Sequence, residues 1–419
     1  ASKTHPKSAH DKFKTVSKWK LLNMNIKELT YYIQSANINF LIGSGASRPY
    51  LATLGSIEKL LTRLNDDMHS HPEPKYKIAE ASIYKAFYDS VIAPNRFFGY
   101  GSDYCETKSN YQNYLITWNN LLNKRHSRIL NKQLNIFTTN IDLMIEDAAS
   151  GLGVELNDGF RGSIDPIYDE ANFMKSIMQT SIHFQHTSEV PVFNLLKIHG
   201  SINWSDRDNH IVHERFWYCY VDDEIKKLGD DKFVNLFIES EKRKTEKTYE
   251  QIIEDAEGLE LSYDASEYDN FITAYKKFII INPTKRKFAE TVLDYHFYEL
   301  MRLYSNALEK ENSVLFVVGF SFADEHIATL TRRSAENNPT LKVIIFAYCD
   351  EEEESLKKNI GIDSTCVNNN ILIITPTKMR ELNVDDDYND MVCDIEHLDM
   401  NAINKIFEYI NKTIHASYE

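Results

Sequence analysis

The sequence lacks paired cysteines, long apolar runs and an excess of basic side chains. Its five cysteines (Cys105, Cys219, Cys349, Cys366 and Cys393) include no Cys-x-x-Cys pair, so neither a structural zinc site nor a redox pair is indicated. No run of roughly 18 apolar residues occurs, which excludes a membrane-spanning helix. The first residues show no apolar core of the kind that signal peptides have. We therefore expect a cytoplasmic protein with no membrane partner and no bound metal.

Basic side chains are outnumbered, 47 against 62 acidic ones, and the formal net charge is −15. Proteins that bind the phosphate backbone usually present a basic face, so we expect no direct nucleic-acid binding. Hydrophobic residues make up 42% of the chain, which is enough for a large core. A length of 419 residues suits two or three domains, or one α/β domain with large insertions.

Short apolar runs followed by helix-like segments recur along the chain and predict parallel strands. The runs lie at 39–42, 134–139, 192–198, 278–283, 314–318, 341–348 and 371–375. Helices are predicted at 26–35, 143–149 and 288–308, and residues 160–190 show no regular pattern. Alternating strands and helices predict an α/β fold with a Rossmann-like parallel sheet, covered on both faces.

Two segments, at about 56–130 and 204–278, are too long for ordinary crossovers and are mainly helical in pattern. We predict that they are insertions forming a second helical layer. Residues 1–22 are predicted to be an N-terminal arm, and residues 23–419 a single domain. Apolar side chains of the first insertion suit an interface, a lid or a core equally: Leu60, Leu61, Leu64, Phe87, Tyr88, Phe97 and Phe98.

A glycine-spaced turn, Gly43-Ser44-Gly45-Ala46-Ser47, follows the first strand and precedes a helix-like stretch at 54–64. Glycines let a phosphate approach the backbone closely, and the amides at the start of the next helix can bind it. The turn lacks the third glycine of the dinucleotide fingerprint, so the pattern alone also fits an ordinary turn.

Polar side chains follow several of the other strands. In open α/β sheets, ligands bind outside the carboxyl ends of the strands, which would place these residues along one edge. They are Asn140, Asp142, His199, Ser201, Asn282, Gly319 and Ser321. Each also has a simpler interpretation: Asn140 as a helix N-cap, His199 as a satisfied buried histidine, and Gly319 and Ser321 as turn residues.

Three further clusters were weighed as binding sites. His183 with His186, and His210 with His213, have a spacing that joins side chains on a helix but not on a strand. Neither segment has a helical pattern, so no metal site is predicted there. The basic run 285–287 could neutralise a phosphate or lie on a solvated surface.

Taken together, four stretches resemble the sirtuin catalytic domain, and more closely the bacterial sirtuin-like proteins of antiphage defence. They are Gly43 to Ser47, Thr138 to Asp142, Lys197 to Ser201, and Gly319 to Ser321. The layout is closest to the sirtuin component of two-gene sirtuin–HerA systems. The resemblance covers roughly 30–200 and 278–375 and leaves the two insertions unmatched. It implies that the sheet is of the sirtuin type and that residues 23–419 are a sirtuin-like NAD-binding catalytic domain.

The resemblance implies an NAD⁺ site, with NAD⁺ as the substrate. It assigns His199 as the catalytic base, with Asn140 and Asp142 facing the nicotinamide ribose. The implied binding residues are Gly43, Ser44, Gly45, Ala46 and Ser47 for the pyrophosphate, Gly319 and Ser321 for the adenosine side, and Thr139, Gly200 and Ser201 beside them.

Two departures from the deacylating sirtuins bear on the reaction. Those enzymes hold a zinc with paired cysteines, which are absent here, and follow the glycine turn with a Gly-Ile-Pro-Asp-Phe-Arg loop that residues 48–55 do not reproduce. We therefore expect an NAD⁺ glycohydrolase that acts in defence by depleting NAD⁺. An NAD-dependent protein deacylase and a non-catalytic nucleotide-sensing module are the alternatives.

Control of such an activity is expected to come from outside the catalytic fold. About 45 residues follow the last predicted strand, too few for a fused sensor domain. The chain is therefore expected to be a homo-oligomer and to work with a separate HerA-type ATPase.

Overall fold

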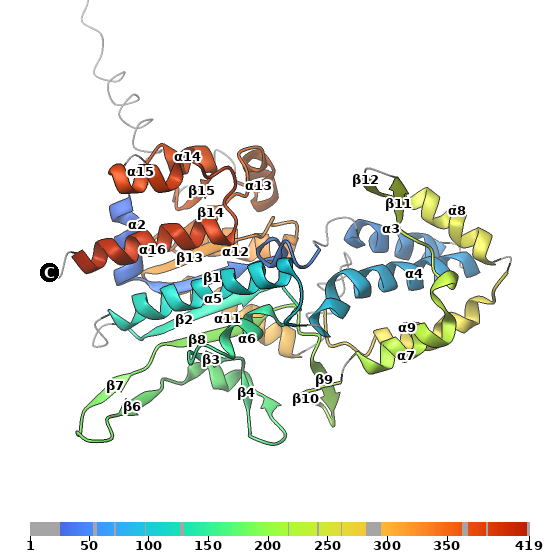
Figure 1. Cartoon of the computed structure of the whole chain (residues 1–419), viewed down its shortest axis with the longest axis horizontal. Helices are drawn as coiled ribbons and strands as arrows, with labels where there is room; N and C mark the ends of the chain where they lie inside the picture. Colours follow the sequence, from blue (N-terminus) through green and yellow to red (C-terminus); the bar gives the residue numbers. More distant parts are fainter. Residues whose placement is uncertain are drawn as a thin grey trace, which may run out of the picture.

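A seven-stranded parallel sheet forms the centre of the computed structural model (Figure 1). The structure describes residues 26–52, 57–70, 73–96, 98–125, 130–216, 218–240, 243–260, 262–281, 295–362, 368–382 and 384–416. In spatial order the strands are β15 (Ile371–Ile374), β14 (Lys342–Phe346), β13 (Ser313–Val318), β1 (Asn37–Ile42), β2 (Gln133–Thr138), β8 (Val192–Lys197) and β3 (Glu155–Asn157). The predicted α/β fold with a parallel sheet is confirmed.

Both faces of the sheet are buried, because alternate side chains of each strand enter different cores. In β1, Phe40 packs with the core of one face and Leu41 with that of the other. Helices α2 (Ile26–Ser35), α5 (Ser102–Asn123), α6 (Met144–Ala149), α14 (Pro376–Arg380), α15 (Asp386–Val392) and α16 (Met400–Ala416) cover the first face. Helices α11 (Tyr295–Glu309), α12 (Glu325–Asn337) and α13 (Glu352–Ile360) cover the second.

A second helical layer stands beside the sheet, as Figure 1 shows, and has a core of its own. It consists of α3 (Ile57–Ser70), α4 (Pro74–Phe87), the π-helix η2 (Tyr88–Ile92), α7 (Cys219–Leu228), α8 (Tyr249–Glu260) and α9 (Asp269–Tyr275). Both predicted insertions therefore supply it. None of the described helices is long and apolar enough to cross a bilayer.

One helix of the first insertion departs from the prediction, because α5 packs on the sheet and not in the second layer. Its Trp118 meets Phe40 of β1 edge to face, with ring centroids 5.1 Å apart. The apolar residues Leu61, Leu64 and Phe87 are buried in the second layer, so they form a core and no surface. Phe97 lies outside the described residues.

Short β elements appear where the sequence showed no strand pattern. A small sheet consists of β4 (Phe160–Arg161), β5 (Ile167–Tyr168), β9 (Trp204–Arg207) and β10 (His210–His213). Two hairpins are formed by the pairs β6 (Met178–Thr180) with β7 (Thr187–Glu189) and β11 (Phe237–Ser240) with β12 (Arg243–Glu246). The described residues also form short 3₁₀ turns, namely η1 (Ser44–Ser47), η3 (Ala93–Arg96), η4 (Glu170–Met174), η5 (Asp230–Lys232) and η6 (Ala265–Tyr268). Strands of two to four residues are too short to show a two-residue period, which explains why the sequence did not predict the strands within 160–190 and 204–278.

One expected strand is absent from its predicted place. Among the described residues of 278–283, Ile280 makes a single antiparallel bridge to Gly200 and joins no strand of the main sheet. The segment is apolar because Phe278 and Ile280 enter the second-layer core while Ile281 enters the core of the sheet. The helix predicted after the glycine turn is present as α3, which begins at Ile57 after the single turn η1 and packs in the second layer.

The contact between the loops after β1 and β13 provides a stability test. Gly319 has φ +63°, and a Cβ there would lie 2.4 Å from the Ala46 nitrogen. We expect Gly319→Ala to lower the free energy of unfolding by about 2 kcal/mol or more, from left-handed backbone strain and backbone overlap together. Urea unfolding would measure the loss.

Gly258→Ala in α8 is the matched control, because nothing lies within 4 Å of its Cβ position. It should leave stability unchanged or raise it by up to about 1 kcal/mol, the helix propensity difference between the two residues. Equal stabilities of the two variants would contradict the close approach.

Candidate functional site

The register of the parallel sheet brings the predicted site residues to one level. Ile42 pairs with both Thr138 and Val318, and Thr138 pairs with Lys197. The carboxyl ends of β13, β1, β2 and β8 therefore lie side by side. Asn140 and His199 each come two residues after a paired position, on neighbouring strands.

The glycine turn is held by the loop that follows β13. The Gly43 amide donates to the Val318 carbonyl and the Gly45 amide donates to the Gly319 carbonyl, each at 3.0 Å. A Cβ on Gly43 would lie 2.5 Å from the Gly319 oxygen, so the two backbones touch where no side chain fits. The Ala46 amide also stays within the turn and donates to the Gly43 carbonyl at 3.1 Å. These three amides support the turn itself.

A buried polar cluster joins the glycine turn to the end of β2. Ser47 Oγ donates to Asp142 Oδ2 at 3.0 Å and accepts from Asn140 Nδ2 at 3.2 Å. Since its one proton goes to Asp142, the hydroxyl accepts from the Tyr111 phenol, 3.0 Å away on α5. Burial raises the pKa of Tyr111, which keeps the phenol a neutral donor.

The side-chain amide of Asn140 has hydrogen-bond partners on its nitrogen but, among the described residues, none on its oxygen. Its Nδ2 also donates to the Gly43 carbonyl at 3.1 Å, which fixes the amide plane. Within the residues that the structure describes, its Oδ1 is buried and has no hydrogen-bond partner. Asn140 is not the cap of α6, because Asp142 Oδ1 accepts the Met144 amide at 3.0 Å in that place. A buried acceptor without a donor is costly, so this oxygen suits a bound hydroxyl or water.

Lys197, the last residue of β8, connects the segments that follow β2 and β8 through hydrogen bonds and an ion pair. Its ammonium donates to the backbone carbonyl of Asp142, to Ser201 Oγ at 3.0 Å and to Glu146 Oε1 at 2.6 Å. All three of its protons are therefore used. Burial raises the pKa values of Asp142 and Glu146, and the Lys197 ammonium opposes that rise.

His199 contacts an acidic residue from the far side of the glycine turn. Its Nε2 lies 3.1 Å from Asp324 Oδ2, and the two side chains are 9% and 7% exposed. Asp324 caps α12, since its Oδ1 accepts the amides of His326 at 3.1 Å and Ile327 at 3.3 Å. The buried histidine thus has a protein partner, as the simpler interpretation of His199 requires.

The structure does not gather the remaining predicted binding residues around one cavity. Gly200, at φ +76°, lies against Ile279, and the Ser201 amide donates to the Ile279 carbonyl at 3.3 Å. Thr139 is half-buried, and its amide donates to the Ile42 carbonyl at 3.3 Å. Ser44 is half-buried and Ser321 is exposed.

The clusters weighed as metal sites show no metal geometry. Among the described residues there is no group of three or more His, Cys, Asp or Glu side chains that could hold a metal ion. His210 and His213 lie on the strand β10, with no helix to join them. Asn282 and the basic run 285–287 lie outside the described residues.

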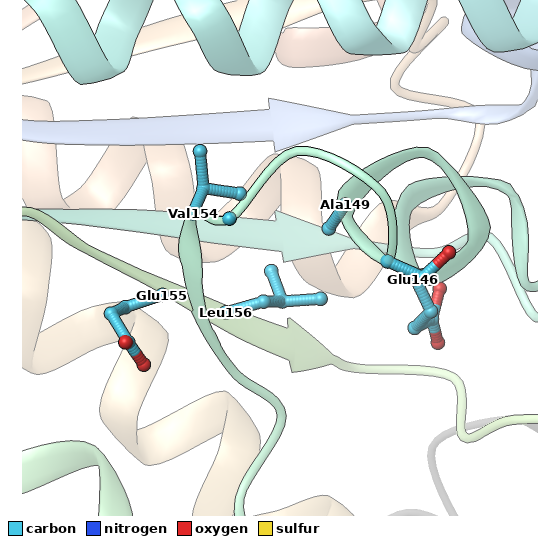
Figure 2. A pocket seen from close by; sticks show the side chains of 7 residues that line it. Glu146, Ala149, Val154, Glu155 and Leu156 are labelled. Carbon is cyan, nitrogen blue, oxygen red and sulfur yellow. The ribbon is translucent and has the colours of Figure 1, made fainter.

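A depression of about 270 Å³ lies between α6 and β3. Figure 2 shows Glu146 and Glu155 at its two ends, with Leu156 between them. None of its lining residues is a predicted site residue. Glu146 alone joins it to the polar cluster, through the ion pair with Lys197.

Four residues of the cluster were not predicted to have a role: Tyr111, Glu146, Lys197 and Asp324. Lys197 could have been found, because a charged side chain within a buried apolar strand needs a partner. Asp324 fits the pattern of a helix N-cap. Tyr111 gives no signal, since it lies within a helical segment 64 residues from Ser47.

The comparison with known proteins agrees with part of this picture. Residues 266–365 match the family described as the SIR2-like domain, which supports a sirtuin-like, NAD-related domain. The matched region includes Gly319, Ser321 and Asp324 but neither the glycine turn nor Asn140 and His199. No curated protein matches the chain.

Replacing Lys197 tests the cluster as a structural unit. Lys197→Met leaves Glu146 Oε1 and the Asp142 carbonyl without their cation, and the lysine is only 4% exposed. We expect the free energy of unfolding to fall by about 3 kcal/mol, the lower end for a broken buried pair because Glu146 is 23% exposed.

Lys227→Met is the matched control, because its ammonium is also 2.6 Å from a glutamate but 69% exposed. Its urea midpoint should equal that of the wild type. A Lys197→Met midpoint as high as the control would show that the buried pair contributes nothing.

Proposed function

We propose that this sirtuin-like chain is an NAD⁺ hydrolase that releases nicotinamide and ADP-ribose. The observation that carries the proposal is the buried Asn140 Oδ1 without a partner among the described residues, held beside the glycine turn at the strand edge that also presents His199. Binding alone does not require an amide and an imidazole at neighbouring strand ends. A reaction that must place a water or a ribose hydroxyl and remove its proton does.

The proposed reaction breaks the bond between nicotinamide and C1′ of the ribose. Nicotinamide leaves as a neutral molecule with the bonding electron pair, and the oxygen of a water forms the new bond to C1′. Asn140 Oδ1 accepts a hydrogen bond from that water or from a ribose hydroxyl, and His199 takes the proton that is released. Positive charge that develops on the ribose is stabilised by the carboxylate of Asp142 nearby.

The residues at this edge fit a ribose better than they fit a pyrophosphate. Asn140 Oδ1 supplies the acceptor that a hydroxyl needs. The amides of Gly43, Gly45 and Ala46, by contrast, already donate within the protein. The phosphates would therefore rely on other donors of the turn, such as the hydroxyl of half-buried Ser44.

Incubating the purified chain with NAD⁺ and following nicotinamide release tests the function. We expect His199→Ala to lower the rate by about two to four orders of magnitude, the usual range for a general base, without unfolding the protein. His69→Ala is the control, because His69 is exposed in the last turn of α3 in the second layer and its loss should leave the rate unchanged.

The other outcomes separate the alternatives. Nicotinamide release only in the presence of an acylated lysine peptide would indicate a deacylase. NAD⁺ binding without any release would indicate a sensing module. Full activity of His199→Ala would exclude His199 as the base.

The resemblance to two-gene defence proteins supports a biological role in antiphage defence by NAD⁺ depletion, with a HerA-type ATPase as partner. The same resemblance favours a homo-oligomer. The hairpin β6–β7 offers a surface for a second copy, since Ile182 and Phe184 near its tip are 94% and 76% exposed. Residues 176–188 carry no Asp, Glu, Lys or Arg, so two acidic chains meet there without like-charge repulsion.

Light scattering on the wild type and on the double variant Ile182→Asp with Phe184→Asp tests this assembly. We expect the wild type to be oligomeric and the variant to shift to the monomer, because four introduced carboxylates would face one another in each pair of copies. Ile164→Asp, on another exposed loop, is the control. A monomeric wild type would contradict the assembly, and unrestrained NAD⁺ hydrolysis by the isolated chain would contradict the expected control of the activity by a partner.

A further inference from the structure

The geometry points to Asp324 as a positioning residue that sets the tautomer and orientation of His199. This inference rests on the proposed function, in which His199 is the base. A carboxylate only accepts hydrogen bonds, so the 3.1 Å contact with Asp324 Oδ2 requires the proton of the neutral imidazole on Nε2. The lone pair that can take up a proton then lies on Nδ1.

Asp324 is itself held firmly, by contacts that leave one oxygen for the histidine. Oδ1 accepts two amides at the first turn of α12, a helix of 13 residues. The positive end of the helix favours the ionised carboxylate. With Oδ1 fixed in this way, Oδ2 is directed at the imidazole.

The contact also spans the candidate site. Asp324 follows β13 and His199 follows β8, and the spatial order β13-β1-β2-β8 places two strands between them. The pair therefore reaches across the carboxyl ends of β1 and β2, where the glycine turn and Asn140 lie. This is the place from which a base must act on a group held by Asn140.

Other ionisable groups lie on the elements that meet at His199. Lys197 precedes it on β8 and is paired with Glu146, and Asp142 lies across from it at the end of β2. Glu325 and His326 follow Asp324 on α12. Ile279, Ile280 and Ile281, which pack against the His199 backbone, carry no ionisable side chain.

The test replaces the carboxylate by its neutral isostere. Asp324→Asn keeps an oxygen for the cap but removes the charge that stabilises the imidazolium. We expect kcat to fall by at least roughly 10- to 100-fold, the loss seen when the hydrogen-bond partner of a metal-bound histidine is removed, with KM for NAD⁺ changed less than about threefold. The acid limb of the profile of kcat/KM against pH should move to lower pH by about one unit, because the protonated base loses its counter-charge.

Asp385→Asn is the matched control, because Asp385 caps α15 through the Tyr388 amide, away from the strand ends. Its pH profile should match the wild type. If Asp324→Asn unfolds, Asp324→Ser supplies a capping hydroxyl and is read in the same way. An acid limb that stays in place in a folded variant overturns the inference.

A second readout does not depend on turnover. NMR of a chain labelled with ¹⁵N-histidine, with His199 identified by its loss in His199→Gln, reports the ring tautomer and the titration midpoint. We expect the Nε2–H tautomer in the wild type and a lower midpoint in Asp324→Asn. If the wild type releases no nicotinamide, the proposed function fails while these signals still test the contact; an Nδ1–H tautomer or an unmoved midpoint rejects it.

Discussion

The candidate site depends on the in-register parallel pairing of four central strands. Because Ile42 is level with Thr138 and Val318, and Thr138 is level with Lys197, each strand releases its chain at the same height. A shift of two residues in any pair would move one polar group by about 6.6 Å, the rise of two strand residues, which is more than a hydrogen bond can span. The contacts of Ser47, Asn140 and Asp142 exist only in this register.

Much of the sheet could be predicted from the sequence, and most of the contacts within the site could not. Buried parallel strands are continuous apolar runs, so 192–198 and 314–318 were recognised from composition alone. The segment 278–283 has the same composition but lies between two cores, and an apolar pattern does not say which kind of burial causes it. Tyr111 contacts Ser47 from a position 64 residues away in the sequence, and Asp324 contacts His199 from a position 125 residues away. No local sequence pattern encodes contacts over such separations.

The second helical layer takes part in shaping the strand ends. Its core includes Ile141 and Ile202, which belong to the loops after β2 and β8, and Ile280 beside them. The buried Asn95 of η3 also accepts the Leu143 amide at 3.0 Å through its side-chain oxygen. The insertions therefore fix the loop that carries Asn140 and Asp142 from the side away from the sheet.

The charges at the strand edge favour one end of the proposed substrate. Among the described residues of the cluster, Asp142, Glu146 and Asp324 contribute carboxyl groups, and Lys197, which Glu146 already engages, contributes an ammonium. A site with this balance attracts the cationic nicotinamide ribose and stabilises the positive charge that forms when nicotinamide leaves, but it repels phosphate. The described residues thus favour the bond cleavage that we propose. In that proposal uncharged donors hold the phosphates, because an added cation at this edge would weaken the stabilisation of the ribose on which the proposed reaction depends.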